Sequence, residues 1–169
     1  GLSAVGVALG DISWDRPELL DNWRKEIVRA GIPIYPVIGN HDHERKKGGD
    51  LESSAAYRSR MCPENYAFFI GKDVFFSLDD IIYTADKGYN EGYADHVLAF
   101  VRGVMKYVPA SADVYIAQHS PVVGRDKGKR IIGASDMMNL IEGHKTLFLS
   151  GHNHVSKSYK YSDNVYEHN

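Results

Sequence analysis

The sequence predicts an α/β protein whose functional residues gather at one edge of a sheet. An apolar run, a helix-like segment and a second apolar run follow one another over residues 4–38, which is the pattern of a βαβ unit with parallel strands. Four apolar runs, at residues 4–9, 32–38, 113–118 and 146–150, each lead into Asp, Asn or His. Because ligands of α/β sheets bind outside the carboxyl ends of the strands, these polar residues are expected to converge.

The size and charge of the chain narrow the class of protein. A length of 169 residues suits one domain, spanning 1–169. A net charge of −2 gives no general attraction to nucleic acid or to an anionic membrane. No apolar run reaches membrane-spanning length, and with Cys62 alone no intrachain disulfide can form. The chain opens directly on a strand-like run without an initiating Met, so we interpret it as part of a longer protein.

The first helix is predicted to begin near Asp15. Asp15 can cap a helix, Pro17 would lie in the first turn, and Glu18 follows three residues after the cap. Gly31 suits the end of the helix. Between these signals, apolar residues recur at helical spacing and would form the buried stripe: Leu19, Leu20, Trp23, Ile27 and Ala30.

The later elements follow from the same kind of pattern. Residues 66–70 and 74–78 predict a β-hairpin around a short turn, which could extend through residues 81–83. Helices are predicted for residues 91–107 and 135–141 from their apolar spacing.

Two polar segments are predicted to be loops. Residues 43–65 are polar and basic, with room for one short helix, and are interpreted as a loop or lid beside Asn40 and His41. Residues 124–130 are basic and interrupted by glycine. A solvated surface loop is the simpler interpretation of the second segment, and a rim for an anionic substrate is the functional alternative.

A pair of histidines, His152 and His154, follows the strand-like run 146–150 and Gly151. In an extended backbone, residues two apart point to the same side, so both imidazoles could face one space. Imidazole is the commonest protein ligand for transition metals, and Gly151 would leave room for a close approach of the backbone. An isolated pair would be read as surface histidines. The three other strand ends that deliver polar residues favour a metal site instead.

In chain order, the polar strand ends resemble the motifs of the calcineurin-like metallophosphoesterases. That family carries DxH, GD, GNH followed by D or E, a His, and GHxH. Four of these five blocks have counterparts here: Gly10-Asp11, Gly39-Asn40-His41-Asp42, His119 with Pro121, and Gly151-His152-Asn153-His154. The resemblance covers nearly the whole chain. It implies an αββα sandwich around two metals, here lacking its first strand and its last strands.

The resemblance also implies a role for each position. Asp11 would bridge two metals, and His154 would bind one of them. His41 would not be a ligand but would act over the phosphate, as general acid or as stabiliser of developing charge. The other metal would be completed by the three remaining ligands, Asn40, His119 and His152. The implied reaction is hydrolysis of phosphomonoesters or phosphodiesters by a metal-bound hydroxide, with Mn, Fe or Zn as metals.

The sequence departs from the family pattern in two places. The DxH block is absent, so the metal of His154 would keep only Asp11 and His154; we interpret this as a fragment rather than as a mononuclear or inactive protein. Many family members also place a second Asp three residues after the first, where Trp14 stands here. Asp15 comes one residue late, and either caps the helix or acts on His41. Trp14 is most simply a packing residue, or a pocket wall near Asp11.

Several weaker candidates and two alternative functions stay open. Asp42 either orients the neighbouring site or is a turn residue. His43 and Arg45 could touch a phosphorylated substrate, although a polar loop is the simpler interpretation of both. One alternative function is an inactive scaffold that binds a protein partner. The other is a mononuclear zinc hydrolase built on Asp11, His119 and His152. The sequence identifies neither the substrate nor the oligomeric state.

Overall fold

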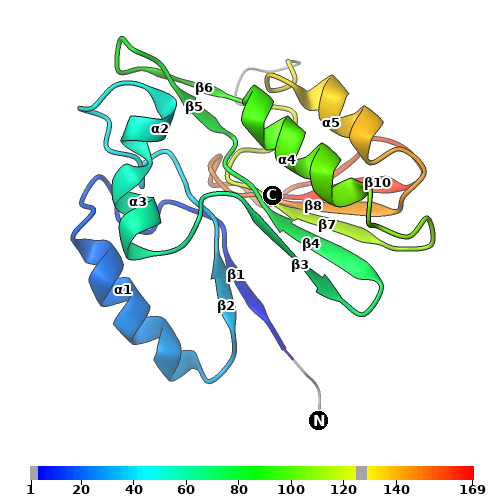
Figure 1. The fold of residues 1–169 in the computed structure, drawn as a ribbon, viewed down its shortest axis with the longest axis horizontal. Helices are drawn as coiled ribbons and strands as arrows, with labels where there is room; N and C mark the ends of the chain where they lie inside the picture. The colour runs from blue at the N-terminus through cyan, green and yellow to red at the C-terminus, as the bar shows by residue number, and fades with distance from the viewer. Residues whose placement is uncertain (1–3, 125–128) are drawn as a thin grey trace.

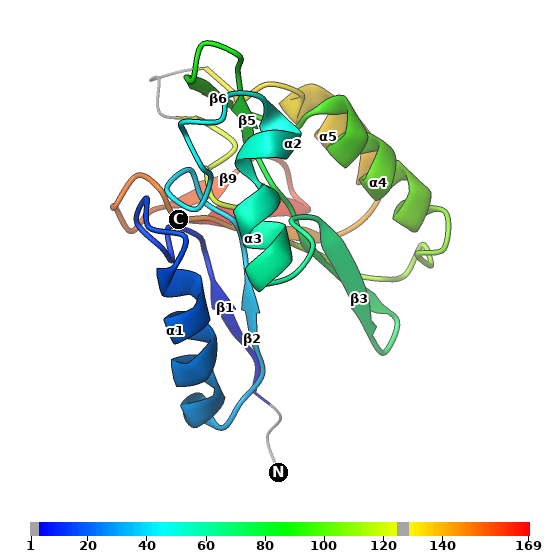
Figure 2. The same cartoon turned by 60° about the vertical axis from the view of Figure 1, so that its left-hand side comes forward.

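Two sheets packed face to face, with helices on both outer sides, form the architecture of the computed structural model (Figures 1 and 2). The structure describes residues 4–124 and 129–169. The centre of the basic loop predicted at residues 124–130 therefore lies outside the described residues. In chain order the elements are β1 (Gly6–Ala8), α1 (Leu19–Ile27), β2 (Ile34–Pro36), α2 (Asp50–Ser53), α3 (Ala55–Arg60), β3 (Tyr66–Ile70), β4 (Asp73–Ser77), β5 (Ile81–Tyr83), β6 (Tyr89–Glu91), α4 (Asp95–Met105), β7 (Val114–Ala117), α5 (Ala134–Leu140), β8 (Thr146–Leu149), β9 (Ser158–Lys160) and β10 (Val165–His168).

The strands form two sheets that face each other and a separate hairpin. β1 and β2 pair in parallel, with Gly6 opposite Ile34, as the βαβ pattern predicts. The larger sheet has the order β3-β4-β7-β8-β10-β9, in which β4, β7, β8 and β10 run parallel and the two edge strands run antiparallel. β5 and β6 form a two-stranded antiparallel hairpin of their own.

Three buried clusters hold the layers together. One lies between α1, α3 and the end of β2, around Leu20, Ile38 and Tyr57. The second lies between the two sheets, where Val37 packs with Phe75 and Ala117. The largest lies between the six-stranded sheet and the helices α4 and α5. The layer order is therefore helix, sheet, sheet, helix, as the αββα prediction requires.

Several elements differ from their predicted bounds. The first helix begins at Leu19 rather than near Asp15, because Trp14 and Asp15 adopt left-handed backbone conformations (φ 51° and 64°) that a helix does not accept. It ends through a 3₁₀ turn at Gly31, which has the predicted left-handed conformation (φ 71°). Within the apolar stripe only Leu20 is fully buried.

The hairpin of β3 and β4 is confirmed, but its suggested extension through residues 81–83 is wrong. The chain leaves the sheet after Ser77, and β5 pairs with β6 instead. Glu91, the first residue of the predicted helix 91–107, belongs to β6, and α4 begins only at Asp95. None of the helices in the described part of the chain is both long and apolar enough to cross a bilayer.

Candidate metal centre

Four polar side chains from different strand ends meet at one point. The ligand atoms of Asp11, His119 and His152 all lie within 4.8 Å of one another. His119 Nε2 is 3.0 Å from Asn40 Oδ1, 3.0 Å from His152 Nδ1 and 3.3 Å from Asp11 Oδ1. Asn40 and both histidines are buried, and Asp11 is largely so. The predicted convergence of these four residues is therefore present in the fold.

The sheet topology explains how these residues meet. Asp11 follows β1, Asn40 follows β2, His119 follows β7 and His152 follows β8. β1 and β2 are parallel neighbours in one sheet, and β7 and β8 are parallel neighbours in the other. Carboxyl ends of parallel strands lie at one edge of a sheet. Two such edges lying together bring the four side chains into one space.

Two glycines allow the backbones to approach this closely. A Cβ atom on Gly39 would lie 2.4 Å from the Asp11 backbone nitrogen and 2.5 Å from Asp11 Oδ1. A Cβ atom on Gly10, which has a φ of 88°, would lie 2.5 Å from His119 Nδ1. Any other residue at either position would push Asp11 or His119 out of place. At Gly151 the constraint is milder, since the nearest atom to an added Cβ is the Leu9 oxygen at 3.3 Å.

The hydrogen bonds outside the cluster fix which ring nitrogens face it. His119 Nδ1 lies 2.7 Å from the carbonyl oxygen of Leu9, which can only accept, so Nδ1 carries the proton and Nε2 presents a lone pair. His152 Nε2 lies 3.0 Å from Glu91 Oε1, and a proton on Nε2 would leave a lone pair on Nδ1. In that tautomer two imidazole lone pairs and two oxygen atoms face one another. A positive charge at the centre of this arrangement would stabilise it.

The electrostatics of the cluster agree with that requirement. Burial disfavours the charged form of His119, but the adjacent Asp11 carboxylate outweighs it and raises the pKa of His119. Burial also opposes the charge of Asp11, yet its hydrogen bond and ion pair with His119 lower the pKa of Asp11. A proton on His119 can thus occupy the position between the ligand atoms at which a cation would bind. A donor set of imidazole nitrogen, carboxylate oxygen and amide oxygen fits Zn, Mn or Fe.

Two buried carboxylates, Asp42 and Asp80, accept hydrogen bonds from backbone amides in the loops that carry the ligand residues. Asp42 accepts from Ser13 N at 2.6 Å and from Gly39 N at 2.9 Å, so it joins the loop of Asp11 to the loop of Asn40. Asp80 accepts from the backbone of His119 and Ser120, at 2.9 and 2.8 Å. Complete burial raises the pKa of Asp80 to about 7, although these bonds favour its charged form. Asp42 is completely buried and has the geometry of a residue that holds these two loops together.

His41 lies beside the cluster with its ring partly open to solvent. Its backbone N–H donates to Asp11 Oδ1 at 3.0 Å, and its Nδ1 lies 2.9 Å from Asp15 Oδ2. Trp14 stacks on the ring at 4.5 Å between centroids, with 57% of its own surface exposed. Of the two predicted roles for Asp15, the structure shows the contact with His41 and no capping bond. Trp14 is not a core packing residue.

His43 and Arg45, the two residues predicted to touch a substrate, differ in their exposure to solvent. His43 is buried, with Nδ1 2.9 Å from Ser53 Oγ and Nε2 3.3 Å from Asp79 Oδ1, so both ring nitrogens already have protein partners, although the residue borders the cavity described next. Arg45 is exposed and lines a cavity of about 690 Å³ near Asp15, which leaves a substrate contact open to it.

His154 lies outside the group of converging ligand atoms and is exposed. The reason is local, because the backbone after β8 is not extended as the prediction assumed. His152 and His154 both have left-handed conformations, with φ of 64° and 52°. Residues two apart in such a loop do not share a face as they would in a strand.

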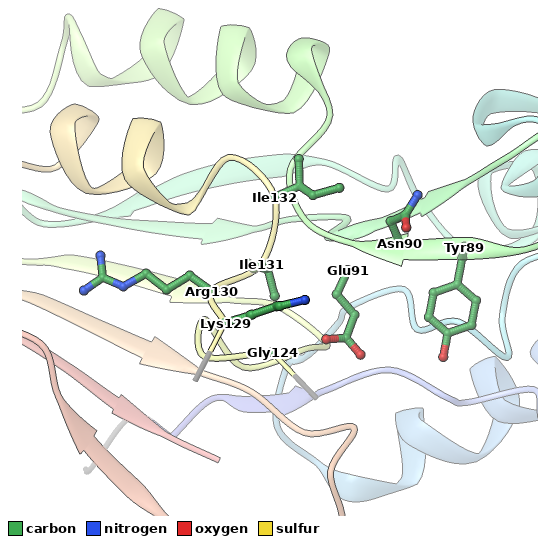
Figure 3. Close-up of a pocket in the computed structure, with 8 residues that line it drawn as sticks. All are labelled: Tyr89, Asn90, Glu91, Gly124, Lys129, Arg130, Ile131 and Ile132. Atoms are coloured by element: carbon green, nitrogen blue, oxygen red, sulfur yellow. The ribbon is translucent and has the colours of Figure 1, made fainter. Parts of the chain in front are cut away.

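Sequence reasoning missed the residues that the hairpin of β5 and β6 brings to the cluster. Glu91 contacts His152, as described above, and the Tyr83 hydroxyl donates to the Asn40 carbonyl oxygen at 2.9 Å. Figure 3 shows Glu91 and Tyr89 on one side of β6, in a pocket of about 530 Å³ that Lys129 and Arg130 also line. Alternating polar residues in a short hairpin were the only available signal, and no spacing rule linked them to a histidine about sixty residues away.

Comparison with solved structures shows a protein of similar fold. The chain is similar to the crystal structure of a dimetal phosphatase from Danio rerio, with a TM-score of 0.66 over 97% of this chain and 71% of that chain. The fold resembles that of a dimetal phosphatase. The sequence identity is 16%, so the likeness concerns the fold alone. No family model matches the sequence, and no curated protein does.

Proposed function

We propose that this protein hydrolyses phosphomonoesters or phosphodiesters at a metal centre held by Asp11, Asn40, His119 and His152. The observation that carries the proposal is the gathering of four ligand atoms around one point, with His119 Nε2 and His152 Nδ1 both turned inward. The motif resemblance and the fold of a dimetal phosphatase support the same reaction class. A scaffold that only binds a protein partner would require no such arrangement.

The residues around the centre have distinct tasks in this reaction. The bound metal would neutralise charge on the phosphoryl oxygens and lower the pKa of the attacking water. His41 stands next to Asp11 and is open to solvent, so it can reach the phosphate or the leaving group. With Nδ1 bonded to Asp15, Nε2 of His41 is the atom that can donate a proton to the leaving oxygen.

The number of metals is a separate question within the proposal. A second metal at Asp11 and His154 is what the motif resemblance implies, and the similar structure is named a dimetal phosphatase. A mononuclear hydrolase is the alternative, and it is favoured by the exposed position of His154 outside the converging group. Counting bound metal per chain by elemental analysis distinguishes the two.

Hydrolysis assays on the purified protein test the reaction. With Mn²⁺ or Zn²⁺ we expect turnover of p-nitrophenyl phosphate or its bis-ester, and loss of turnover on chelation. His41→Ala should lower kcat by roughly 10²–10⁴-fold, the usual contribution of a general acid. His96→Ala, at an exposed position of α4, is the matched control and should change nothing. Absence of turnover by the metal-loaded protein, or full activity of His41→Ala, would contradict the proposal.

A further inference from the structure

The hairpin of β5 and β6 contacts three of the four residues that form the candidate centre. Asp80, one residue before β5, accepts from the backbone of His119, and Tyr83 on β5 bonds the carbonyl of Asn40. Glu91, the last residue of β6, bonds the ring of His152. The hairpin belongs to neither large sheet, so contacts of this kind determine where it sits relative to the ligands (Figure 1).

The contact between Glu91 and His152 is the only one of the three that acts on a ligating ring. Glu91 Oε1 lies 3.0 Å from His152 Nε2, and the two side chains are 15% and 3% exposed. The opposite ring nitrogen, Nδ1, lies 3.0 Å from His119 Nε2, on the side of the candidate metal position. Tyr89 packs edge-on against the same ring, at 6.4 Å and 74°. The ring is therefore held from two sides by β6.

We propose that Glu91 is a positioning residue for the metal ligand His152, accepting the Nε2 proton so that Nδ1 presents its lone pair to the metal. The inference rests on the proposed function. A neutral imidazole has one proton and two nitrogens, and a metal can bind only the nitrogen without the proton. A carboxylate at the other nitrogen selects that tautomer, fixes the ring orientation and makes the ligand more basic.

In His119, as in His152, the ring nitrogen that faces away from the centre has a hydrogen-bond acceptor, but the acceptor is of a different kind. His119 donates its Nδ1 proton to the backbone carbonyl of Leu9, which no side-chain substitution removes. His152 depends on a side chain supplied by a separate hairpin. The two imidazoles thus have one backbone acceptor and one carboxylate acceptor, and only the second can be removed by mutation.

Titration of the metal-free protein with Co²⁺, followed by visible absorption, measures the effect of Glu91 on metal affinity. We expect Glu91→Ala to weaken binding about 10–100-fold, the usual effect of losing such a partner. Glu91→Gln keeps an acceptor oxygen and should weaken it less. Asn90→Ala is the matched control, because Asn90 lies on the same strand and points to the other side (Figure 3). Equal affinity of Glu91→Ala and wild type would overturn the proposal.

A second measurement needs no variant. Long-range ¹H–¹⁵N NMR spectra of the metal-free wild-type protein at pH 8.5, where an ordinary imidazole is neutral, report which nitrogen of His152 is protonated. The proposal requires the proton on Nε2, and a proton on Nδ1 would refute it. Failure of the proposed function looks different: the wild-type protein would then bind no Co²⁺, or would bind it without hydrolysing phosphoesters, whatever the effect of Glu91→Ala.

Discussion

Gly39 shows at the scale of one residue how tightly the candidate centre is built. The space that its missing side chain leaves is filled by the backbone and carboxylate of Asp11 and by the ring of His119. Gly103, in the last turn of α4, is the opposite case, since an added Cβ would meet nothing within 4 Å. The same substitution should therefore have opposite effects at the two positions.

We expect Gly39→Ala to destabilise the protein by about 1–3 kcal/mol, the usual cost of forced overpacking, and to displace Asp11. Gly103→Ala should stabilise it by about 0.5–1 kcal/mol, because alanine is the better helix former and restricts the unfolded chain. Urea unfolding of both variants measures the two effects. A Gly39→Ala protein as stable as Gly103→Ala would contradict the packing described here.

The sequence allowed some residues of the centre to be predicted and not others. Asp11, Asn40, His119 and His152 lie two to four residues beyond strand ends, so the topology of parallel sheets was enough to bring them together. Glu91 could not be predicted, because its place beside His152 depends on how a separate hairpin packs. The burial of His43 was equally hidden, since its partners Ser53 and Asp79 lie in other elements.

At the scale of elements, the last strand is tied to the loops of the centre by a buried carboxyl group. Glu167 on β10 accepts hydrogen bonds from Ser150, which follows β8, from Tyr161, and from the backbone of Val122. Burial raises the pKa of Glu167, and the hydrogen bonds from Tyr161, Ser150 and Val122 only partly oppose this. The strand that carries Glu167 and the segments around His119 and His152 are thus linked through one titratable group.

The pH dependence of stability tests this link. Because the folded pKa of Glu167 is raised, its contribution is fully present below the unfolded pKa near 4.5 and is lost as pH rises through the folded pKa. Glu167→Gln stays neutral throughout. Urea unfolding from pH 4 to 8 should therefore show the free energy of unfolding of wild type falling relative to Glu167→Gln. A free energy of unfolding of wild type that rises with pH relative to that of Glu167→Gln would show that the sign is wrong.

Elements with strong periodicity were predictable, and those set by tertiary contacts were not. The hairpin of β3 and β4 and the short helix α5 follow from apolar spacing and turn residues. The start of α1 was misplaced because the contact of Asp15 with His41 competes with helix capping. The backbone after β8 was predicted to be extended, but His152 adopts a left-handed conformation there.

At the scale of the whole molecule, the layer order places the candidate centre where the two sheets deliver their strand ends together. Each sheet supplies two of the four residues, and the hairpin of β5 and β6, together with Asp80 just before it, contacts three of them. The motif order in the sequence predicted this architecture, and the likeness to a dimetal phosphatase fold agrees with it. The substrate depends on loops for which the sequence offers no comparable pattern.

Crystals soaked in Zn²⁺, with anomalous diffraction recorded at the zinc edge, test the metal centre most directly. We expect an anomalous peak that places a zinc ion about 2.0–2.2 Å from each of four ligands, which are Asp11, Asn40 Oδ1, His119 Nε2 and His152 Nδ1. No peak between these four side chains, or rings of His119 and His152 that turn other nitrogens toward it, would contradict the account.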